Sequence, residues 1–153
     1  MTEPLPPLAR LFAMAFRDLV DGLHAELAAR GWTDVRPVHG FVLLAAAQDP
    51  PTVTEVGALL GVSKQAAAKL LEQMVAAGYL DRSGDATDAR LVRVTLTSRG
   101  RDLLAAVEEV YADLEARWGR VIGPQEVERI RGRLDTVLRA GNGGRLPAVR
   151  PTW

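Results

Sequence analysis

Two lysines occur within the stretch GVSKQAAAKLLEQM, residues 61–74, and every other basic residue of the chain is an arginine. Helical spacing places Gln65, Ala68 and Lys69 on one side of this stretch, with Lys64 at the flank. An amide can pair with adenine N6 and N7, a methyl can pack on thymine, and an ammonium can reach guanine or phosphate. These residue types, at this spacing, indicate chemistry suited to reading base edges in DNA.

The helix that would carry these residues has clear signals at both ends. Ser63 is a favourable N-cap, and Gly78 ends the segment. Ser63 and Lys64 lie near the free amides of the helix start, where phosphate contacts are favoured. The opposite face is apolar and predicts burial of Ala67, Leu70, Leu71 and Met74.

A second helix precedes this one across a tight turn. Thr52 and Glu55 form a T-x-x-E capping box, and Gly61 ends the short helix that follows. The region 52–78 therefore predicts a helix-turn-helix. Next come a strand predicted at 79–82, a polar loop at 83–89, and a period-2 strand at 91–97. A hairpin directly after a helix-turn-helix is a wing.

Long amphipathic helices flank this region. Apolar residues recur at helical spacing from 8 to 27, and a second helix is predicted over 37–48, between Pro37 and the Asp49-Pro50-Pro51 stop. A fifth helix runs from the cap at 97 or 98 to about Trp118, and a sixth follows Gly123-Pro124. We predict a single, mainly α domain over 1–153 with a small β-hairpin wing. Its parts are helices at 8–48 and 98–140, the winged helix-turn-helix at 52–97, and a mobile tail at 141–153.

The segments TVTEVGALLGVSKQAAAKLLEQMVAAGYLDR and DATDARLVRVTLTSRG resemble the multiple-antibiotic-resistance-regulator (MarR) family of winged helix-turn-helix transcription factors. The D-x-R of Asp88-Ala89-Arg90 and the L-T-x-x-G that begins at Leu96 carry the resemblance, which extends over about residues 8–140. It implies a homodimer joined through the flanking helices. Such proteins bind pseudo-palindromic double-stranded DNA, mostly as repressors, and many release it when a small aromatic acid or phenolic effector binds.

The resemblance also assigns roles in the wing. It implies that Arg90 enters the minor groove and that Asp88 braces it, which agrees with the attraction of arginine to a narrow minor groove. Arg82 and Arg93, at the hairpin base, are expected to contact phosphates. Ala66 and Ala68 stand where relatives often have Ser or Thr, and Ala86 and Ala89 stand where proline and a second arginine are common. Fewer polar contacts per half-site are therefore expected.

An organic effector would require a pocket near the flanking helices. Residues there that could line one are aromatic, basic or apolar: Phe12, Phe16, Arg36, His39, Val42 and Leu43. Arg36 or His39 could pair with a carboxylate, although the two phenylalanines also fit a core stripe and His39 also fits an interface. The two histidines have no metal-ligand neighbours at helical spacing and the chain has no cysteine, so no metal and no cofactor is expected.

Composition narrows the classes of function. The net charge is zero, but residues 60–101 carry an excess of three positive charges and residues 1–59 an equal negative excess. No apolar run is long enough to cross a membrane and no secretory signal is present, so we expect a cytoplasmic protein. No nucleophile–base pair or phosphate-binding glycine loop suggests an enzyme. The alternative is a winged-helix module that binds protein, which should expose apolar anchors on the face of 64–72.

Overall fold

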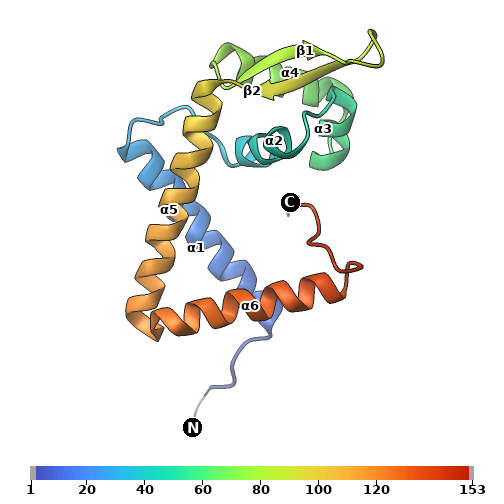
Figure 1. Ribbon diagram of the computed structural model, residues 1–153. Coiled ribbons are helices and arrows are strands. Elements are labelled where there is room, and N and C mark those ends of the chain that lie inside the picture. Colours follow the sequence, from blue (N-terminus) through green and yellow to red (C-terminus); the bar gives the residue numbers. More distant parts are fainter. Residues whose placement is uncertain (1–2, 152–153) are drawn as a thin grey trace.

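Six helices and one β-hairpin make up residues 3–151, the part of the chain that the computed structural model describes (Figure 1). In chain order they are α1 (Leu8–Ala29), α2 (Pro37–Gln48), α3 (Val53–Leu60), α4 (Lys64–Ala76), β1 (Leu80–Gly84), β2 (Val92–Leu96), α5 (Ser98–Ile122) and α6 (Pro124–Ala140). The expected fold class, mainly α with a hairpin wing, is confirmed.

The helix ends follow the capping chemistry of the sequence. Thr52 Oγ1 accepts a hydrogen bond from the Glu55 backbone N at 3.2 Å, and Glu55 Oε2 accepts one from the Thr52 N at 3.2 Å. Ser63 Oγ accepts from the backbone N of Ala66 at 3.1 Å at the start of α4. Gly61 ends α3 with φ 68°, a conformation that glycine adopts without a steric cost.

The hydrophobic core fills one lobe, formed by α2, α3, α4, the hairpin and the first part of α5, and it continues between α1 and α5, where Leu23, Leu27, Val110 and Leu114 are buried. Helix α2 is apolar on nearly all sides and lies in the middle of this lobe (Figure 1), so Val42 and Leu43 are fully buried. From the other elements, fully buried side chains include Val56, Ala67, Met74, Leu80 and Leu103. This core holds α3 and α4 in a fixed arrangement.

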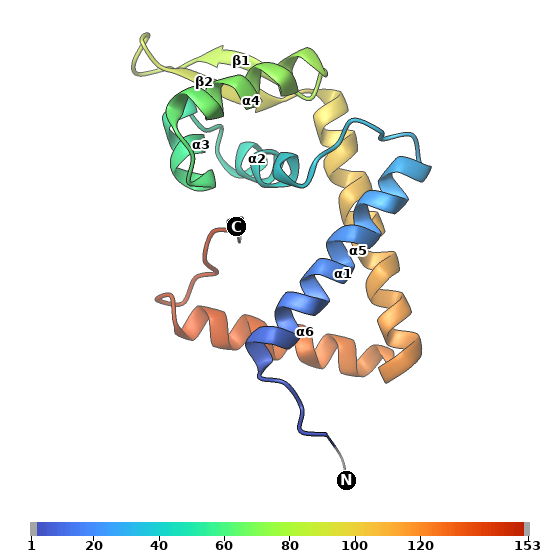
Figure 2. The same cartoon turned by 180° about the vertical axis from the view of Figure 1, so that it is seen from behind.

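Helices α1 and α5 lie side by side below this lobe, and α6 turns away from the end of α5 (Figures 1 and 2). Gly123, with φ 96°, forms the bend. Within the described residues, α6 has no buried side chain. Large apolar side chains are exposed on α1, on α6 and at the bend: Leu8, Leu11, Phe12, Met14, Phe16, Val121, Ile122, Ile130, Val137 and Leu138.

A polar and aromatic cluster joins the lobe to the long helices. The Arg99 guanidinium lies 5.1 Å from the Trp32 ring centroid and 4.9 Å from that of Tyr79. The Tyr79 hydroxyl accepts from Arg99 Nη2 at 3.3 Å and donates to Asp34 Oδ1 at 2.5 Å. Gly100 packs so closely here that a Cβ would lie 2.2 Å from the Tyr79 carbonyl oxygen. The first turn of α5 is therefore fixed to the lobe.

The structure corrects three predicted boundaries. Tyr79 was expected to begin a strand, but it is a fully buried core residue after the Gly78 turn, and β1 begins at Leu80. Ser83 and Gly84 were expected in the loop, yet they extend β1 by pairing with β2. Helix α5 continues past Trp118 to Ile122 and ends at Gly123, whose φ is 96°.

Candidate nucleic-acid interface

Helices α3 and α4 are held together by a close turn. The Val62 backbone N donates to the Gly57 carbonyl at 3.0 Å, and a Cβ on Gly57 would lie only 3.1 Å from the Val62 carbonyl oxygen. Glycine at 57 therefore lets the turn pack against α3, while Gly61 reverses the chain direction. The result is a rigid helix-turn-helix that presents α4.

Helix α4 buries the face that the sequence predicts and exposes the other. The buried side chains are Ala67, Leu70, Leu71 and Met74. Ser63, Lys64, Gln65 and Lys69 are exposed, whereas Ala68 is half-buried. Among the ion pairs of residues 3–151, none involves Lys64 or Lys69, so both ammonium groups can meet an anion.

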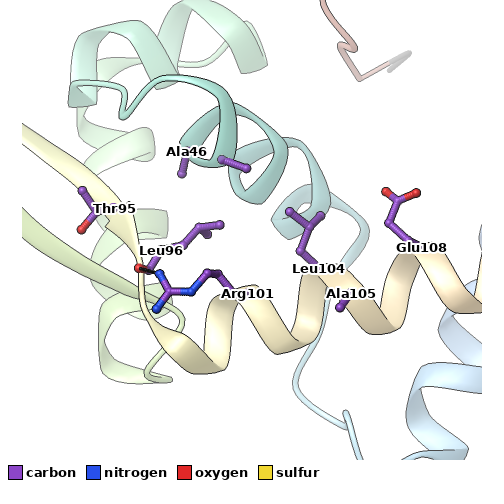
Figure 3. Close-up of a pocket in the computed structure, with 8 residues that line it drawn as sticks. Ala46, Thr95, Leu96, Arg101, Leu104, Ala105 and Glu108 are labelled. Carbon is purple, nitrogen blue, oxygen red and sulfur yellow. Dashed lines mark hydrogen bonds between the residues drawn. The ribbon is translucent and has the colours of Figure 1, made fainter.

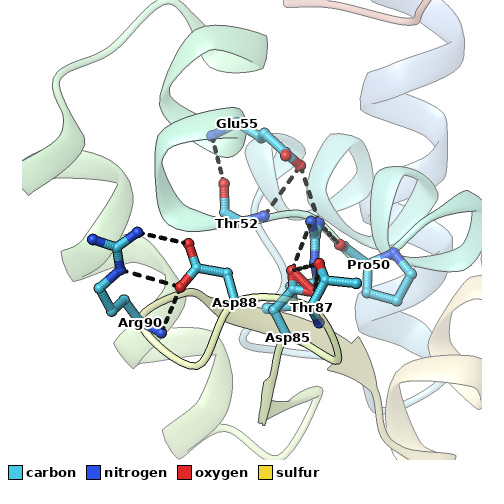
Figure 4. Close-up of polar contacts among 8 residues, drawn as sticks. Pro50, Thr52, Glu55, Asp85, Thr87, Asp88 and Arg90 are labelled. Atoms are coloured by element: carbon cyan, nitrogen blue, oxygen red, sulfur yellow. Dashed lines mark hydrogen bonds and ion pairs between the residues drawn. The ribbon is translucent and has the colours of Figure 1, made fainter.

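The wing places one arginine in solvent and orients it. The Arg90 side chain is 91% exposed, and its Nε donates to Asp88 Oδ1 at 3.2 Å. Arg90 Nη2 donates to Asp88 Oδ2 at 3.3 Å, and the Arg90 backbone N donates to Oδ1 at 3.0 Å (Figure 4). The hydrogen bonds from the Arg90 side chain and, to a smaller extent, from the Arg90 backbone lower the pKa of Asp88. Asp88 thus holds Arg90 through both its side chain and its backbone, and the role of this pair on DNA stays a prediction.

The two arginines expected at the hairpin base differ in their surroundings. Arg82 lies on β1 opposite Val94 and is exposed. Arg93 is only 27% exposed and donates from Nη1 to the Pro50 carbonyl at 2.9 Å. It also pairs with Glu55 at 3.7 Å and with Asp85 at 3.5 Å. Arg82 is available for a phosphate, whereas Arg93 contacts other parts of the protein.

The six candidate effector residues do not form one pocket, although Arg36 and His39 are in contact. Val42 and Leu43 are fully buried in the lobe, while Phe12 and Phe16 lie exposed on α1. Arg36 is exposed, and its Nη2 donates to Gln73 Oε1 at 2.9 Å. The spacing of these residues on two amphipathic helices suggested proximity, but α2 turns its apolar side chains into its own lobe. An effector role for them stays a prediction.

His39 is a buried, uncharged histidine at neutral pH. Its Nδ1 accepts from the Arg36 backbone N at 3.1 Å, and its Nε2 has no partner among the described residues. Burial, with a smaller effect of the Arg36 charge, lowers the pKa of His39 to about 4; Asp34 acts in the opposite direction. Its ring lies 6.5 Å from that of Tyr79, so it packs on the cluster below the lobe.

An open concavity of about 540 Å³ lies between α2, β2 and α5 (Figure 3). Ala46, Leu96 and Leu104 supply apolar surface, and Arg101 and Glu108 stand at its side. None of the six candidate effector residues lines it. Arg101 donates from Nη1 to the Leu96 carbonyl at 3.0 Å and from Nη2 to Ser98 Oγ at 3.3 Å.

Residues 3–151 carry neither a metal-binding cluster nor a membrane-spanning helix. No group of three or more histidine, aspartate or glutamate side chains is arranged to hold a metal ion there. In the same range, no helix has the length and apolar character that crossing a membrane requires.

Comparison with known proteins bears on this arrangement. A family model described as MarR family matches residues 33–91, from the segment before α2 to the end of the wing loop. The transcriptional activator of exopolysaccharide II synthesis, ExpG of Rhizobium meliloti (strain 1021), is 31% identical over 111 residues, which are 71% of this chain and 56% of that protein. The chain belongs to the MarR family. It spans about half the length of this curated relative.

Solved structures agree on the fold of the MarR-family chain. The Multiple Antibiotic Resistance Repressor, MarR, superposes with a TM-score of 0.73 at 25% identity, covering 88% of this chain and 97% of that one. RV1404 from Mycobacterium tuberculosis superposes with a TM-score of 0.74 at 24% identity, covering 98% and 100%. The family and fold are therefore those of transcriptional regulators.

The sequence reasoning missed three residues, one in the wing and two in the cluster that joins the lobe to the long helices. Asp85, Trp32 and Arg99 were assigned no role, although Asp85 pairs with Arg93 in the wing and the Arg99 guanidinium lies over both the Trp32 and the Tyr79 ring. The alternation of Val92, Arg93 and Val94 places Arg93 outside the core but gives no signal for its partners. An arginine on a strand that packs across a helix N-terminus can reach protein acceptors there.

Proposed function

We propose that this MarR-family chain is a sequence-specific, double-stranded DNA-binding transcriptional regulator that acts as a homodimer. The observation that carries the proposal is one combined surface. It consists of the exposed Gln65 and Lys69 on the capped helix α4 and the exposed, carboxylate-braced Arg90 on the wing. A helix of this kind fits the major groove, and an arginine beside it fits the adjacent minor groove.

Unpartnered apolar surface supports the homodimer. Helix α6 buries none of its side chains within the described residues, yet it carries Ile130, Val137 and Leu138 exposed. Phe12 and Phe16 of α1 are exposed in the same part of the molecule. Monomeric proteins rarely leave such surface open, and a two-fold partner would cover it. Sedimentation at micromolar concentration should give about twice the chain mass of 16.5 kDa, and a monomer would contradict this architecture.

The form of the binding site follows from the dimer. Two lobes related by a two-fold axis require a pseudo-palindromic operator whose half-sites lie about one helical turn apart, roughly 34–36 Å. We take repression as the sign of regulation, because a dimer over a promoter blocks access to it. One relative is named an activator and another a repressor, so a promoter–reporter assay with and without the protein decides the sign.

The first experiment is a fluorescence-anisotropy titration of the full chain. The probe is the intergenic DNA beside its own gene, and scrambled DNA of equal length is the control at about 0.15 M salt. Tight binding to the intergenic DNA alone supports the proposal. Equal weak binding to both removes sequence specificity at this site, and binding to neither favours a protein-binding role for the wing and α4.

A small aromatic acid or phenolic effector completes the proposal. The concavity between α2, β2 and α5 has a suitable volume for such a molecule, and Arg101 could pair with its carboxylate. Salicylate and a panel of aromatic acids should be added to the preformed protein–DNA complex in the anisotropy assay. Loss of anisotropy with an acid, but not with its amide, supports an effector; an unchanged signal across the panel counts against one.

A further inference from the structure

One arginine connects three separate segments of the lobe. From β2, Arg93 Nη1 donates to the carbonyl of Pro50, in the link between α2 and α3, at 2.9 Å. The same nitrogen lies 3.7 Å from Glu55 Oε2, at the start of α3, and Nη2 lies 3.5 Å from Asp85 Oδ2, in the wing loop. Figure 4 shows Pro50, Glu55 and Asp85 converging from these segments. The wing and the helix-turn-helix therefore share one guanidinium.

The neighbouring backbone makes the same connection. The Val94 N donates to the Pro51 carbonyl at 3.0 Å, and Thr52 forms an antiparallel bridge with Arg93. Glu55 is itself held by the hydrogen bond from the Thr52 N at 3.2 Å. The acceptors around Arg93 are thus fixed before the arginine reaches them. A planar fork of donors suits such an arrangement of acceptors, whereas an ammonium cannot reach all of them.

Asp85 carries the connection into the wing tip. Its side chain is only 11% exposed, and Oδ1 accepts from the Thr87 N at 3.2 Å. The Asp85 backbone N donates to the Leu91 carbonyl at 3.1 Å, and the Leu91 N donates to the Asp88 carbonyl at 3.1 Å. A continuous set of hydrogen bonds thus runs from Asp85 to Asp88, the residue that braces the exposed wing arginine.

These contacts leave Arg93 poorly placed to bind DNA directly. Its side chain is mostly covered, and its two terminal nitrogens already face a carbonyl and two carboxylates. We propose that Arg93 is a positioning residue, paired with Asp85, that fixes the wing to the helix-turn-helix and so sets where the wing arginine lies. The contacts of Arg93 with Asp85, Glu55 and Pro50 are a property of the free protein, while their effect on DNA affinity rests on the proposed DNA-binding function.

Two variants, compared with a matched control, test this assignment in the full chain. Arg93→Lys keeps the positive charge but loses the fork, and Asp85→Asn removes a negative charge from the wing. Asp81→Asn is the matched control, because Asp81 is exposed on β1 of the same hairpin. Positioning predicts that Arg93→Lys and Asp85→Asn each weaken DNA binding about tenfold, while Asp81→Asn binds as tightly as wild type or tighter.

A phosphate contact predicts the opposite pattern. Arg93→Lys would then keep most of the affinity and the salt dependence, and Asp85→Asn would tighten binding by removing a negative charge near DNA. Thermal melting of each variant shows that it is folded. An Asp85→Asn protein that is folded and binds DNA as tightly as Asp81→Asn overturns the positioning role.

Hydrogen exchange of the free protein provides a measurement that needs no DNA. Amides of residues 85–91 should exchange several-fold faster in both Arg93→Lys and Asp85→Asn, with α4 and α5 unchanged and Asp81→Asn like wild type. Unchanged exchange in the wing of both variants overturns the positioning role of Arg93 and Asp85. If wild type binds no DNA at all, the proposed function fails, and the exchange result still decides whether Arg93 and Asp85 hold the wing.

Discussion

Replacing Arg90 with alanine should change how DNA binding depends on salt. The side chain is 91% exposed at the wing tip, so its charge is free to displace counterions when the wing approaches DNA. Each phosphate charge neutralised contributes about 0.9 to the slope of log affinity against log salt. A homodimer has two wings, so the variant should lose roughly 1.8 from the slope. Between about 0.05 M and 0.2 M salt, wild type should then lose about twelvefold more affinity than the variant.

Two further variants make the Arg90 measurement specific. Asp88→Asn leaves the arginine charge but weakens its brace, so the affinity should fall while the slope stays near that of wild type. Arg145→Ala removes one charge from the exposed segment after α6, far along the chain from the wing, and should leave the slope unchanged. Anisotropy titrations at four or more salt concentrations give the slopes. An unchanged slope for Arg90→Ala, or an equal change for Arg145→Ala, would refute an electrostatic contact by the wing.

The other predictions concern base reading, packing and pH. Alanine at both Gln65 and Lys69 should weaken specific binding by about 1–3 kcal/mol per lost base contact and scrambled-DNA binding by less; equal losses in anisotropy would remove the base-reading role. Gly100→Ala should lower the free energy of unfolding in urea by roughly 2 kcal/mol, despite the helix propensity of alanine, because a Cβ would lie 2.2 Å from the Tyr79 carbonyl oxygen; a gain in stability would contradict that packing. Because burial lowers the pKa of His39 from 6.5 to about 4, the unfolded chain binds the extra proton between these values, and stability should fall by up to about 3 kcal/mol as the pH falls through that range. Urea unfolding at pH 7.5 and pH 4.5 measures this, and His39→Asn should reduce the dependence; no reduction would refute the assignment.

Local signals predicted most of the elements. Pro37 and the Asp49-Pro50 stop gave the bounds of α2, and the Thr52–Glu55 box gave the start of α3, because capping groups satisfy backbone donors locally. The buried face of α4 followed from helical periodicity. Where the predicted boundary was wrong, long-range packing determined the structure. Tyrosine is common in strands, yet Tyr79 packs in the core before β1 begins.

The candidate site was predictable to a different extent on each element. The exposed residues of α4 follow from its wheel, and the Asp88–Arg90 spacing of two allows a side-chain contact within one loop. Arg93 was expected to contact phosphates because it lies at the base of the hairpin. Two of its three acceptors, Pro50 and Glu55, lie 43 and 38 positions earlier in the chain, and no local pattern could bring them beside it.

Helix α5 connects the surface that would read DNA to the surface that would hold the dimer. It is 25 residues long, or about 37 Å, with its first turn fixed to the lobe through Arg99 and Gly100 and its last turn leading into α6. A tilt of about 5° at the α6 end would therefore displace the lobe by about 3 Å. In the proposed homodimer, two such lobes would have to match half-sites roughly 34 Å apart, so small changes in packing at the far end of α5 would change the operator spacing that fits without altering any residue proposed to touch DNA.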